Sequence, residues 1–272
     1  MSAPERPPDI KEDPDPIMDE YQLKNLVKFA PARLGLVPRK HLLIHIPKNG
    51  GMAIRHDTQL KSRIVLANRR RLKSKGYADG LKRHMQAMGA QPGYEHARYR
   101  DVDISVRKAT IAFAVVRNPW SRTVSRFKFA LQTRGNGKQA DLSYDRTGFE
   151  AFLEERHAWG GEDYFWHRAI RGWYPQIDYL TDEQNRIEVD VLRQENLTEE
   201  MGRYLSLESE LKPRNVSKVS GTDYRDLYTE KTRQVIADWY AADIDHFGFD
   251  FDTGAVRNTL YAQDRAQAET VS

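Results

Sequence analysis

The sequence of 272 residues contains no cysteine. Disulfide bonds, thiolate nucleophiles and cysteine metal ligands are therefore all excluded. No apolar run approaches the roughly 20 residues that a helix needs to cross a bilayer. The first twenty residues are polar, with prolines and acids in place of the apolar run of a signal peptide. These absences predict a soluble, cytoplasmic protein without a transmembrane segment.

Positive charge gathers in one stretch of the chain. The formal net charge is +4, and the segment KSRIVLANRRRLKSK, from Lys61 to Lys75, holds seven cations and no acid. One interpretation is a helix whose solvated face carries these charges. The other is a binding surface for an anionic ligand, such as a nucleic acid, a nucleotide or an acidic glycan. Composition does not choose among such ligands.

The two ends of the chain differ in composition from its middle. Residues 1–20, which include PERPPDIKEDPDP, are predicted to form a flexible tail, and residues 254–272 a second one. Residues 21–253 are then a single domain, long enough to bury one sizeable core. The sequence carries no signal for an oligomeric state.

Short apolar runs alternate with amphipathic stretches inside this domain. The runs HLLIHIP (41–47) and ATIAFAVV (109–116) predict two buried strands, and RIEVDVLRQENL (186–197) a third, weaker one. Helical character is clearest in TEKTRQVIADWYAADI (229–244). Strands that alternate with helices predict an α/β layer fold with a mainly parallel central sheet flanked by helices. Ligand sites of such folds lie at the carboxyl ends of the strands.

The first predicted strand ends in the segment PKNGG, and a helix-like run begins near Met52. Gly50 and Gly51 let the backbone turn sharply and approach a ligand closely. Unpaired N–H groups at the helix start suit a phosphate or sulfate, and Lys48 adds a movable charge. The usual P-loop is different, because its lysine follows the glycines and precedes a hydroxyl residue. An ordinary Gly-Gly turn with a surface lysine is the alternative.

The second predicted strand ends in VVRNPWSRTVSRF, where an apolar run stops at Arg117. Asn118 is a good N-cap and Pro119 suits a first helical turn, so a helix is expected directly after the arginine. Ser125 then lies about two turns along that helix. The arginine fork, the serine hydroxyl and the helix start predict a second oxyanion pocket. The alternative is a structural arginine that binds a neighbouring carbonyl.

Projection of this helix at about 100° per residue separates an apolar side from a polar side, with Phe129 as the exception among the polar residues. The apolar set is Trp120, Val124, Phe127 and Leu131, and the polar set is Arg122, Ser125 and Arg126. Two anion pockets on two strands of one sheet predict a single ligand with two separated phosphate groups.

Both motifs resemble those of sulfotransferases. IPKNGGMAI is similar to their 5′-phosphosulfate loop, and VVRNPWSRTVSRF to their 3′-phosphate motif, with the same spacing from arginine to serine. The resemblance is to the Golgi-type carbohydrate sulfotransferases, including heparan sulfate 2-O-sulfotransferase, and their bacterial relatives. Four further segments resemble recurrent blocks of that family: WYPQIDYL, VLRQENL, KPRNVSK and DIDHFGFDF.

The resemblance implies a three-layer fold of the P-loop-NTPase type. It also implies transfer of a sulfuryl group from 3′-phosphoadenosine-5′-phosphosulfate (PAPS) to an acceptor, leaving 3′-phosphoadenosine-5′-phosphate (PAP). Lys48 would stabilise the leaving phosphate, and Arg117 and Ser125 would hold the 3′-phosphate. The other implied donor-binding positions are the backbone of Asn49, Gly50, Gly51 and Met52, and a loop with Asn215 and Lys218. No metal is expected, because the lysine supplies the charge.

An acceptor hydroxyl needs a base with a pKa near the working pH. The segment GYEHARYRDV resembles the block that carries the catalytic histidine of heparan sulfate 2-O-sulfotransferase, which makes His96 the leading candidate. His84 is the second candidate and Glu95 the third, since some sulfotransferases use a glutamate. His41 and His45 lie on the first predicted strand and are interpreted as packing residues.

Three positions depart from the family pattern. Asn49, Met52 and Ala53 stand where the family often has threonine or serine. Hydroxyl donors to the phosphosulfate are then missing, and the amide of Asn49 together with the backbone would have to replace them. A family member that binds the donor without turnover is therefore an alternative.

Two further functions stay open from the sequence. A nucleotide or small-molecule kinase would need a metal-anchoring hydroxyl after the lysine, which KNGGMA lacks. A nucleic-acid-binding protein without activity would use the basic run but leaves the Arg117 pocket unexplained, so no nucleic acid partner is expected. The expected partner is an acceptor: a glycan or other glycoconjugate, a glycolipid or a small metabolite. The lack of a membrane anchor indicates a bacterial cytoplasmic enzyme.

Overall fold

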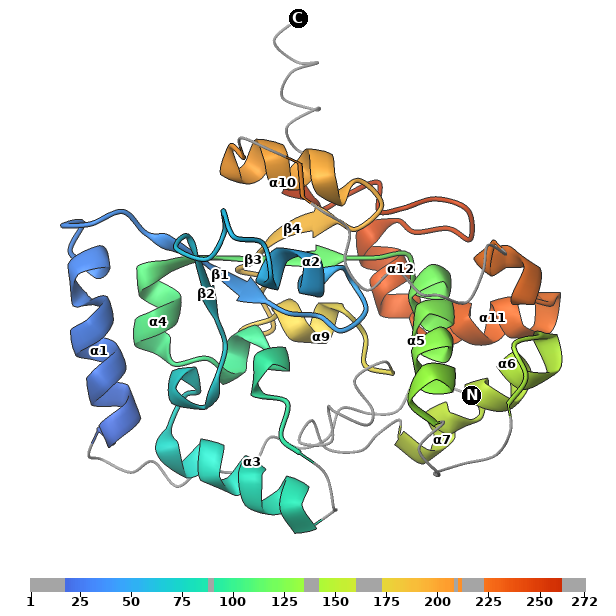
Figure 1. The fold of residues 1–272 in the computed structure, drawn as a ribbon, viewed down its shortest axis with the longest axis horizontal. Helices are drawn as coiled ribbons and strands as arrows, with labels where there is room; N and C mark the ends of the chain where they lie inside the picture. Colours follow the sequence, from blue (N-terminus) through green and yellow to red (C-terminus); the bar gives the residue numbers. More distant parts are fainter. Residues whose placement is uncertain are drawn as a thin grey trace, which may run out of the picture.

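The computed structural model is an α/β fold around one sheet of four parallel strands, and it confirms the predicted fold class (Figure 1). The structure describes residues 18–87, 91–134, 142–159, 173–207, 210–211 and 223–260. The strands are β1 (Lys40–Ile44), β2 (Ile64–Leu66), β3 (Thr110–Val116) and β4 (Asp190–Arg193), in the spatial order β2-β1-β3-β4.

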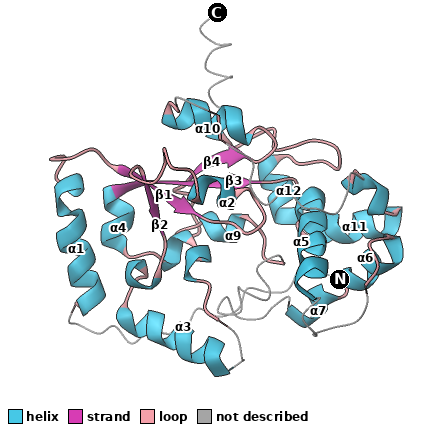
Figure 2. Cartoon of the chain, viewed as in Figure 1, coloured by secondary structure: helices cyan, strands magenta, loops and turns pink. Residues whose placement is uncertain are grey.

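Helices cover both faces of the sheet, which gives three layers (Figure 2). The α-helices are α1 (Glu20–Arg33), α2 (Gly51–Arg55), α3 (Lys75–Ala87), α4 (Ile104–Ala109), α5 (Pro119–Arg134), α6 (Arg146–Leu153), α7 (Glu155–Trp159), α9 (Ile177–Leu180), α10 (Leu197–Leu205), α11 (Glu230–Trp239) and α12 (Ala241–Phe247). No helix in the described part of the chain is both long and apolar enough to span a bilayer.

Alternate residues of the central strands enter two separate cores. Leu42 and Ala114 face the larger core, which holds residues of α3, α5, α6 and α9. Leu43 and Phe113 face the smaller core, which holds residues of α2 and α10. Successive side chains of a strand point to opposite faces, and both faces are covered here. This arrangement explains why the sequences of the two central strands, β1 and β3, are nearly continuous apolar runs.

The three predicted strands are confirmed in place, and the structure adds a fourth, β2. The run at 41–47 forms β1 and then leaves the sheet at His45, the run at 109–116 forms β3, and the weaker one at 186–197 contains the shorter β4. The helix predicted at 229–244 is two helices, because Tyr240 breaks it: this residue has non-helical backbone angles and is fully buried.

The basic run at 61–75 is not a helix, so that interpretation is wrong. It contains β2 and a 3₁₀ turn at Arg69–Arg71. Several of its cations bind protein groups: Arg63 donates to the carbonyl of Leu205, and Arg69 forms an ion pair with Asp79. Residues 64–66 of the run form β2, which pairs with β1. The bonds of Arg63 and Arg69 to protein groups stabilise the fold.

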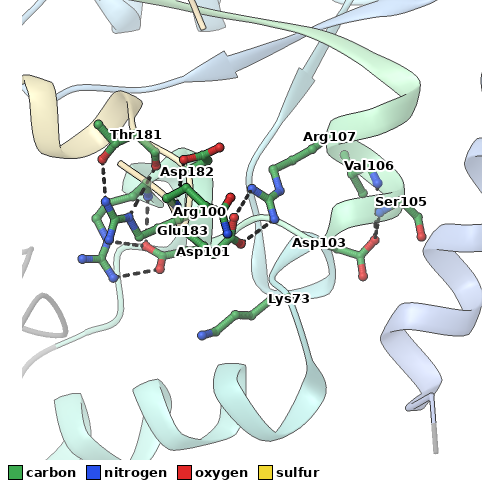
Figure 3. A network of polar contacts seen from close by, with 12 residues as sticks. Lys73, Arg100, Asp101, Asp103, Ser105, Val106, Arg107, Thr181, Asp182 and Glu183 are labelled. Carbon is green, nitrogen blue, oxygen red and sulfur yellow. Dashed lines mark hydrogen bonds and ion pairs between the residues drawn. The ribbon is translucent and has the colours of Figure 1, made fainter. Parts of the chain in front are cut away.

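A polar network anchors the segment that leads from His96 into β3 (Figure 3). Arg100 Nη2 donates to Thr181 Oγ1 at 2.6 Å, and Arg107 forms two hydrogen bonds with the Glu183 carboxylate at 3.0 and 2.6 Å. These bonds tie the segment to the turn that follows α9. The predicted division into a domain at 21–253 and two tails stays a prediction.

Candidate anion-binding site

The two predicted anion-binding motifs meet at one edge of the sheet. β1 and β3 are hydrogen-bonded neighbours and run parallel, so their carboxyl ends lie side by side. Arg117, the first residue after β3, donates from Nη1 to the carbonyl oxygen of Lys48 at 3.1 Å. The site therefore combines both motifs, as a ligand with two separated anionic groups requires.

The loop after β1 has an unusual backbone. Lys48 and Gly50 both have left-handed angles, with φ of 71° and 80°. This conformation costs a residue with a side chain about 1–3 kcal/mol, and the bond from Arg117 to the Lys48 carbonyl helps to hold it. α2 begins at Gly51, so the N–H groups of Gly51 and Met52 lack intrahelical acceptors.

The Lys48 ammonium lies over an aromatic ring. Its Nζ is 4.5 Å from the centroid of Phe129, a favourable cation–π distance. Phe129 is the residue that broke the polar side of the helix projection. Its contact with Lys48 supplies the physical reason: the ring belongs to the site rather than to the core.

Gly51 has no room for a side chain. A Cβ at this position would lie 2.2 Å from Cδ2 and 2.3 Å from Nε2 of His45, whose ring is buried. The glycine is thus needed for close packing between the loop and the end of β1. His45 is a packing residue, as the sequence indicated, and what it packs against is the loop itself.

Gly51→Ala is expected to lower the free energy of unfolding by about 1–3 kcal/mol, because the buried His45 ring must move. Gly202→Ala is the matched control, since a Cβ there meets no atom within 4 Å. It lies inside α10 and should be neutral or stabilise by up to about 1 kcal/mol. Urea unfolding of both variants measures the difference. Equal effects would contradict the packing argument.

Asn49 turns its side chain into the protein. The residue is 1% exposed, and its Nδ2 donates to the carbonyl of Val115 at 2.7 Å and to Oε1 of Gln176 at 2.6 Å. Both amide protons are thereby used. In this structure the Asn49 amide has no proton left to replace a missing hydroxyl, so only backbone N–H groups stand in for it.

Arg117 is held by neutral oxygens. Its Nε and Nη2 donate to Oγ of Ser121 at 2.9 and 2.7 Å. Within the described residues its guanidinium contacts no carboxylate at ion-pair distance. Desolvation lowers its pKa to about 10, although Glu195 acts in the opposite sense, so the group stays charged at neutral pH. A desolvated cation bound only to neutral groups is suited to receive an anion.

The predicted partner of Arg117 was Ser125, but the structure has Ser121 in contact with the guanidinium. Ser121 lies four residues after Arg117, and Ser125 lies one turn further along the same face of α5 and is half-buried. Ser121 was not predicted from the sequence, although its spacing of four residues from the arginine was a usable signal.

Arg122 is not on a solvated helix face. It is 1% exposed, and it donates from Nε to the carbonyl of Pro47 at 3.3 Å and from Nη1 to that of Tyr174 at 2.9 Å. Its guanidinium also lies 5.7 Å from the ring of Tyr240. Arg122 therefore fastens α5 to the loop after β1.

Gln176 joins the two motifs, a role that was not predicted from the sequence. Its Oε1 accepts from Asn49 Nδ2 and from the backbone N–H of Arg117 at 2.9 Å, while its Nε2 donates to the Arg117 carbonyl at 2.8 Å. Gln176 is held in turn by the buried carboxylate of Asp243, which accepts from the Gln176 backbone N–H at 2.8 Å.

Asn118 is the helix N-cap that the sequence predicted. Its Oδ1 accepts from the N–H groups of Trp120 and Ser121 at 3.0 and 3.1 Å. Its own backbone N–H donates to Oε1 of Glu195, just after β4, at 2.7 Å. The carboxyl ends of β1, β3 and β4 thus all contribute to the site.

Asp243→Asn is expected to destabilise the protein by about 1–3 kcal/mol at neutral pH. The carboxylate accepts from three N–H groups, on Gln176 and Ile177, and an amide would turn a donor toward one of them. Burial raises the Asp243 pKa from its ordinary 3.8 to about 6. The native state therefore binds this proton more tightly than the unfolded chain, so the stabilising contribution is largest in acid and is lost as pH rises through about 6.

Urea unfolding on either side of about pH 6 measures both effects, and Asn at position 243 should remove that part of the pH dependence. Asp238→Asn is the matched control, because Asp238 is exposed on α11 and accepts from the exposed Gln234. A loss of stability in Asp238→Asn as large as that in Asp243→Asn would contradict the role given to Asp243.

His96 lies beside the loop after β1. It ends the 3₁₀ turn Tyr94–His96, and its ring centroid is 4.4 Å from that of His45. Its Nδ1 is 2.8 Å from the carbonyl oxygen of His45. A carbonyl only accepts, so this bond puts the proton of a neutral imidazole on Nδ1 and the lone pair on Nε2.

Four further residues were candidates for donor binding or for the base. Asn215 and Lys218 lie outside the described residues. Of the two other base candidates, Glu95 precedes His96 in the same turn and His84 lies on α3. Among the residues that the structure describes, no group of three or more histidine, aspartate or glutamate side chains is arranged to hold a metal ion.

The chain belongs to the sulfotransferase family, whose model matches residues 64–250. This match covers more than half of the chain and includes Arg117 and His96, although it begins after the Lys48 loop. No curated protein matches the chain in a sequence search. The family is one of P-loop-like folds, in agreement with the parallel sheet and its flanking helices.

Proposed function

We propose that this protein transfers a sulfuryl group from PAPS to a hydroxyl or amine of an acceptor, by in-line transfer that needs no metal. The observation that carries the proposal is the contact between Arg117 and the Lys48 carbonyl. It joins the two halves of an anion site in one place, on a chain that belongs to the sulfotransferase family. No observation favours a kinase or a nucleic-acid-binding protein over this function.

One group of site residues is proposed to bind the 5′-phosphosulfate of the donor, and a second group is proposed to bind its 3′-phosphate. Lys48 and the backbone N–H groups of residues 49–52 bind the 5′-phosphosulfate, where the helix start provides unpaired donors. Arg117 and Ser125 bind the 3′-phosphate, and Arg117 exchanges its neutral Ser121 partner for the anion. Asn215 and Lys218 are proposed to approach the nucleotide from a loop over the site. The residues present fit such a ligand, because the N–H groups of Gly51 and Met52 lack intrahelical acceptors at the start of α2 and Arg117 is charged and desolvated.

The chemistry is a displacement at sulfur. The bond between sulfur and the bridging phosphate oxygen breaks, a bond from sulfur to the acceptor oxygen forms, and the leaving phosphate departs with the electron pair. Lys48 stabilises the charge that develops on that phosphate, an electrostatic effect that is typical of group transfers of this kind. His96 Nε2 takes the acceptor proton, since Nδ1 is engaged by the His45 carbonyl.

The proposed acceptor is a carbohydrate or glycoconjugate. The support for this acceptor is the segment around His96, whose sequence resembles that of a polysaccharide sulfotransferase. The loops over a donor site set acceptor choice, and family membership alone does not fix it. Screening with glycans, glycolipids and small hydroxyl or amine metabolites is the direct approach.

The experiment that tests the donor is calorimetric titration of the purified protein, without added metal, with PAP and then with AMP, ADP and ATP. Tight binding of PAP with little heat from the others supports the proposal. Preference for ATP, above all if it requires magnesium, would overturn it and favour a kinase.

His96→Ala is expected to lower turnover of a hydroxyl acceptor by about 10²-fold or more, the usual contribution of general-base catalysis. PAP affinity should stay within a few-fold, because His96 is assigned to the acceptor and not to the donor. His84→Ala is the matched control, since His84 lies on α3 and was the second candidate. Unchanged turnover in His96→Ala would remove it as the base.

A further inference from the structure

Exposed apolar side chains gather in one short stretch of the chain. Nine large hydrophobic residues are exposed in the described part of the protein, and six of them fall between residues 18 and 37. These six are Met18, Leu23, Val27, Leu34, Leu36 and Val37. Single exposed apolar residues are normal, but a contiguous group marks an interaction surface.

α1 has two apolar sides. Tyr21, Asn25 and Phe29 are buried against the body of the protein, where α1 packs on α4, on α3 and on the 3₁₀ turn Arg69–Arg71. At about 100° per residue, Leu23, Val27 and Leu34 fall within about 40° of one another on the opposite side. That side is open: Val27 is 66% exposed and Leu34 71%.

This side of α1 and the segment that follows form one surface, which we call the α1 face: Leu23, Val27, Leu34, Leu36 and Val37 with the cations around them. In Figure 1, α1 lies at the edge of the molecule, far from α2 and α5. The α1 face is therefore separate from the anion-binding site at the carboxyl ends of the strands.

The charges that surround the apolar side chains are mostly positive. Exposed cations on α1 and on the segment up to the start of β1 are Lys24, Lys28, Arg33, Arg39 and Lys40. The one exposed acid in residues 20–40, Glu20, is paired with Lys24 and Lys75. Arg71, burial and Lys40 together lower the pKa of Lys28, as expected where cations lie close together.

A second copy of the chain does not suit this surface. A two-fold interface places the same patch on both sides, which would bring the cations of one copy against those of the other. Apolar side chains set among lysines and arginines are instead the pattern of helices that lie in the interface of an anionic membrane. The apolar groups enter the acyl boundary, and the cations meet the headgroups.

We propose that the α1 face binds the surface of a lipid bilayer that contains anionic lipids. The helix lies on the membrane and does not span it. This inference goes beyond the sulfuryl-transfer function and does not depend on it. Binding should fall as ionic strength rises, because the cationic part of the attraction is screened by salt.

The test is sedimentation of the full-length protein with vesicles of phosphatidylcholine and phosphatidylglycerol, compared with vesicles of phosphatidylcholine alone. The double variant Val27→Ser with Leu34→Ser should bind the mixed vesicles at least tenfold more weakly, because two large apolar groups lose their burial in lipid. Val256→Ser is the matched control, since Val256 is 61% exposed but lies after α12. Lys28→Gln should weaken binding about fivefold.

The outcomes separate the possible occupants of the surface. Binding of the wild type to mixed vesicles, lost in the double variant and kept in Val256→Ser, supports the proposal. Absence of vesicle binding overturns it, and a dimer that the double variant abolishes in analytical ultracentrifugation would then assign the α1 face to a second copy. Equal binding to neutral vesicles would overturn the requirement for anionic lipid. Circular dichroism and PAP titration of each variant check that the fold and the donor site are intact.

Discussion

Lys48→Ala is expected to lower turnover by about 10²- to 10³-fold, the effect of removing one group that stabilises developing charge. Much of the PAP affinity should remain, because Arg117, Ser125 and the backbone N–H groups also hold the nucleotide and are untouched. Turnover should fall further, because charge builds up on the leaving phosphate as the bond to sulfur breaks and Lys48 is the side chain proposed to stabilise it. The measurement is the rate of PAP release from PAPS with an acceptor found by screening, beside PAP calorimetry on the same preparations.

Lys73→Ala is the matched control for this variant. Lys73 also carries its Nζ 4.5 Å from an aromatic centroid, that of Tyr77, but it lies before α3 and outside the site. It should keep wild-type turnover. If Lys48→Ala lost PAP affinity by as large a factor as turnover, the lysine would act only in nucleotide binding, and its proposed role in stabilising the leaving phosphate during transfer would be wrong.

Arg117→Ala is expected to weaken PAP binding by about 10²-fold while AMP binding changes only a few-fold. A desolvated charged contact with a phosphate is worth about 2–5 kcal/mol, and only PAP has the 3′-phosphate that Arg117 is proposed to bind. Calorimetric titration with the two nucleotides measures the difference. Because each ligand meets the same variant, any general loosening of the loop, whose Lys48 carbonyl Arg117 binds, affects both and drops out of the comparison.

Arg117→Lys refines this test. Lysine keeps the charge but cannot reproduce the fork that donates to Ser121 and Lys48 together. An intermediate loss of PAP affinity is expected. Equal losses for PAP and AMP in Arg117→Ala would contradict the 3′-phosphate role and leave the arginine as a structural residue.

The parts of the site that the sequence predicted are those with local signals. An apolar run indicates a buried strand, and paired glycines indicate a sharp turn. Asn118 and Pro119 indicate the start of a helix. Their meeting followed from one general property of α/β folds, that parallel strands end at a common edge. Those inferences required no knowledge of distant residues, so β1, β3 and the two loops were predictable.

The parts that were missed depend on partners far away in the chain. The buried position of Arg122 could not be read from helix periodicity, because two backbone carbonyls from other segments satisfy its donors. The strand β2 was hidden because its three residues, Ile64–Leu66, lie among cations whose charge suggested a solvated face. Gln176 looked like an ordinary polar residue, since its partners Asn49 and Arg117 are contributed by two other strand ends.

The position of Gln176 also bears on how the protein is made. The hydrogen bond from Asn49 to Gln176 spans 127 residues, and Asp243, which holds Gln176, lies 67 residues further on. Domains emerge from the ribosome from their amino-terminal end. A nascent chain that ends before Gln176 carries both anion-binding motifs in full, yet lacks the side chain that joins them and the carboxylate that holds that side chain. The proposed nucleotide pocket is thus completed only after Asp243 has been synthesised, and bound nucleotide should stabilise α12 as well as the loop after β1.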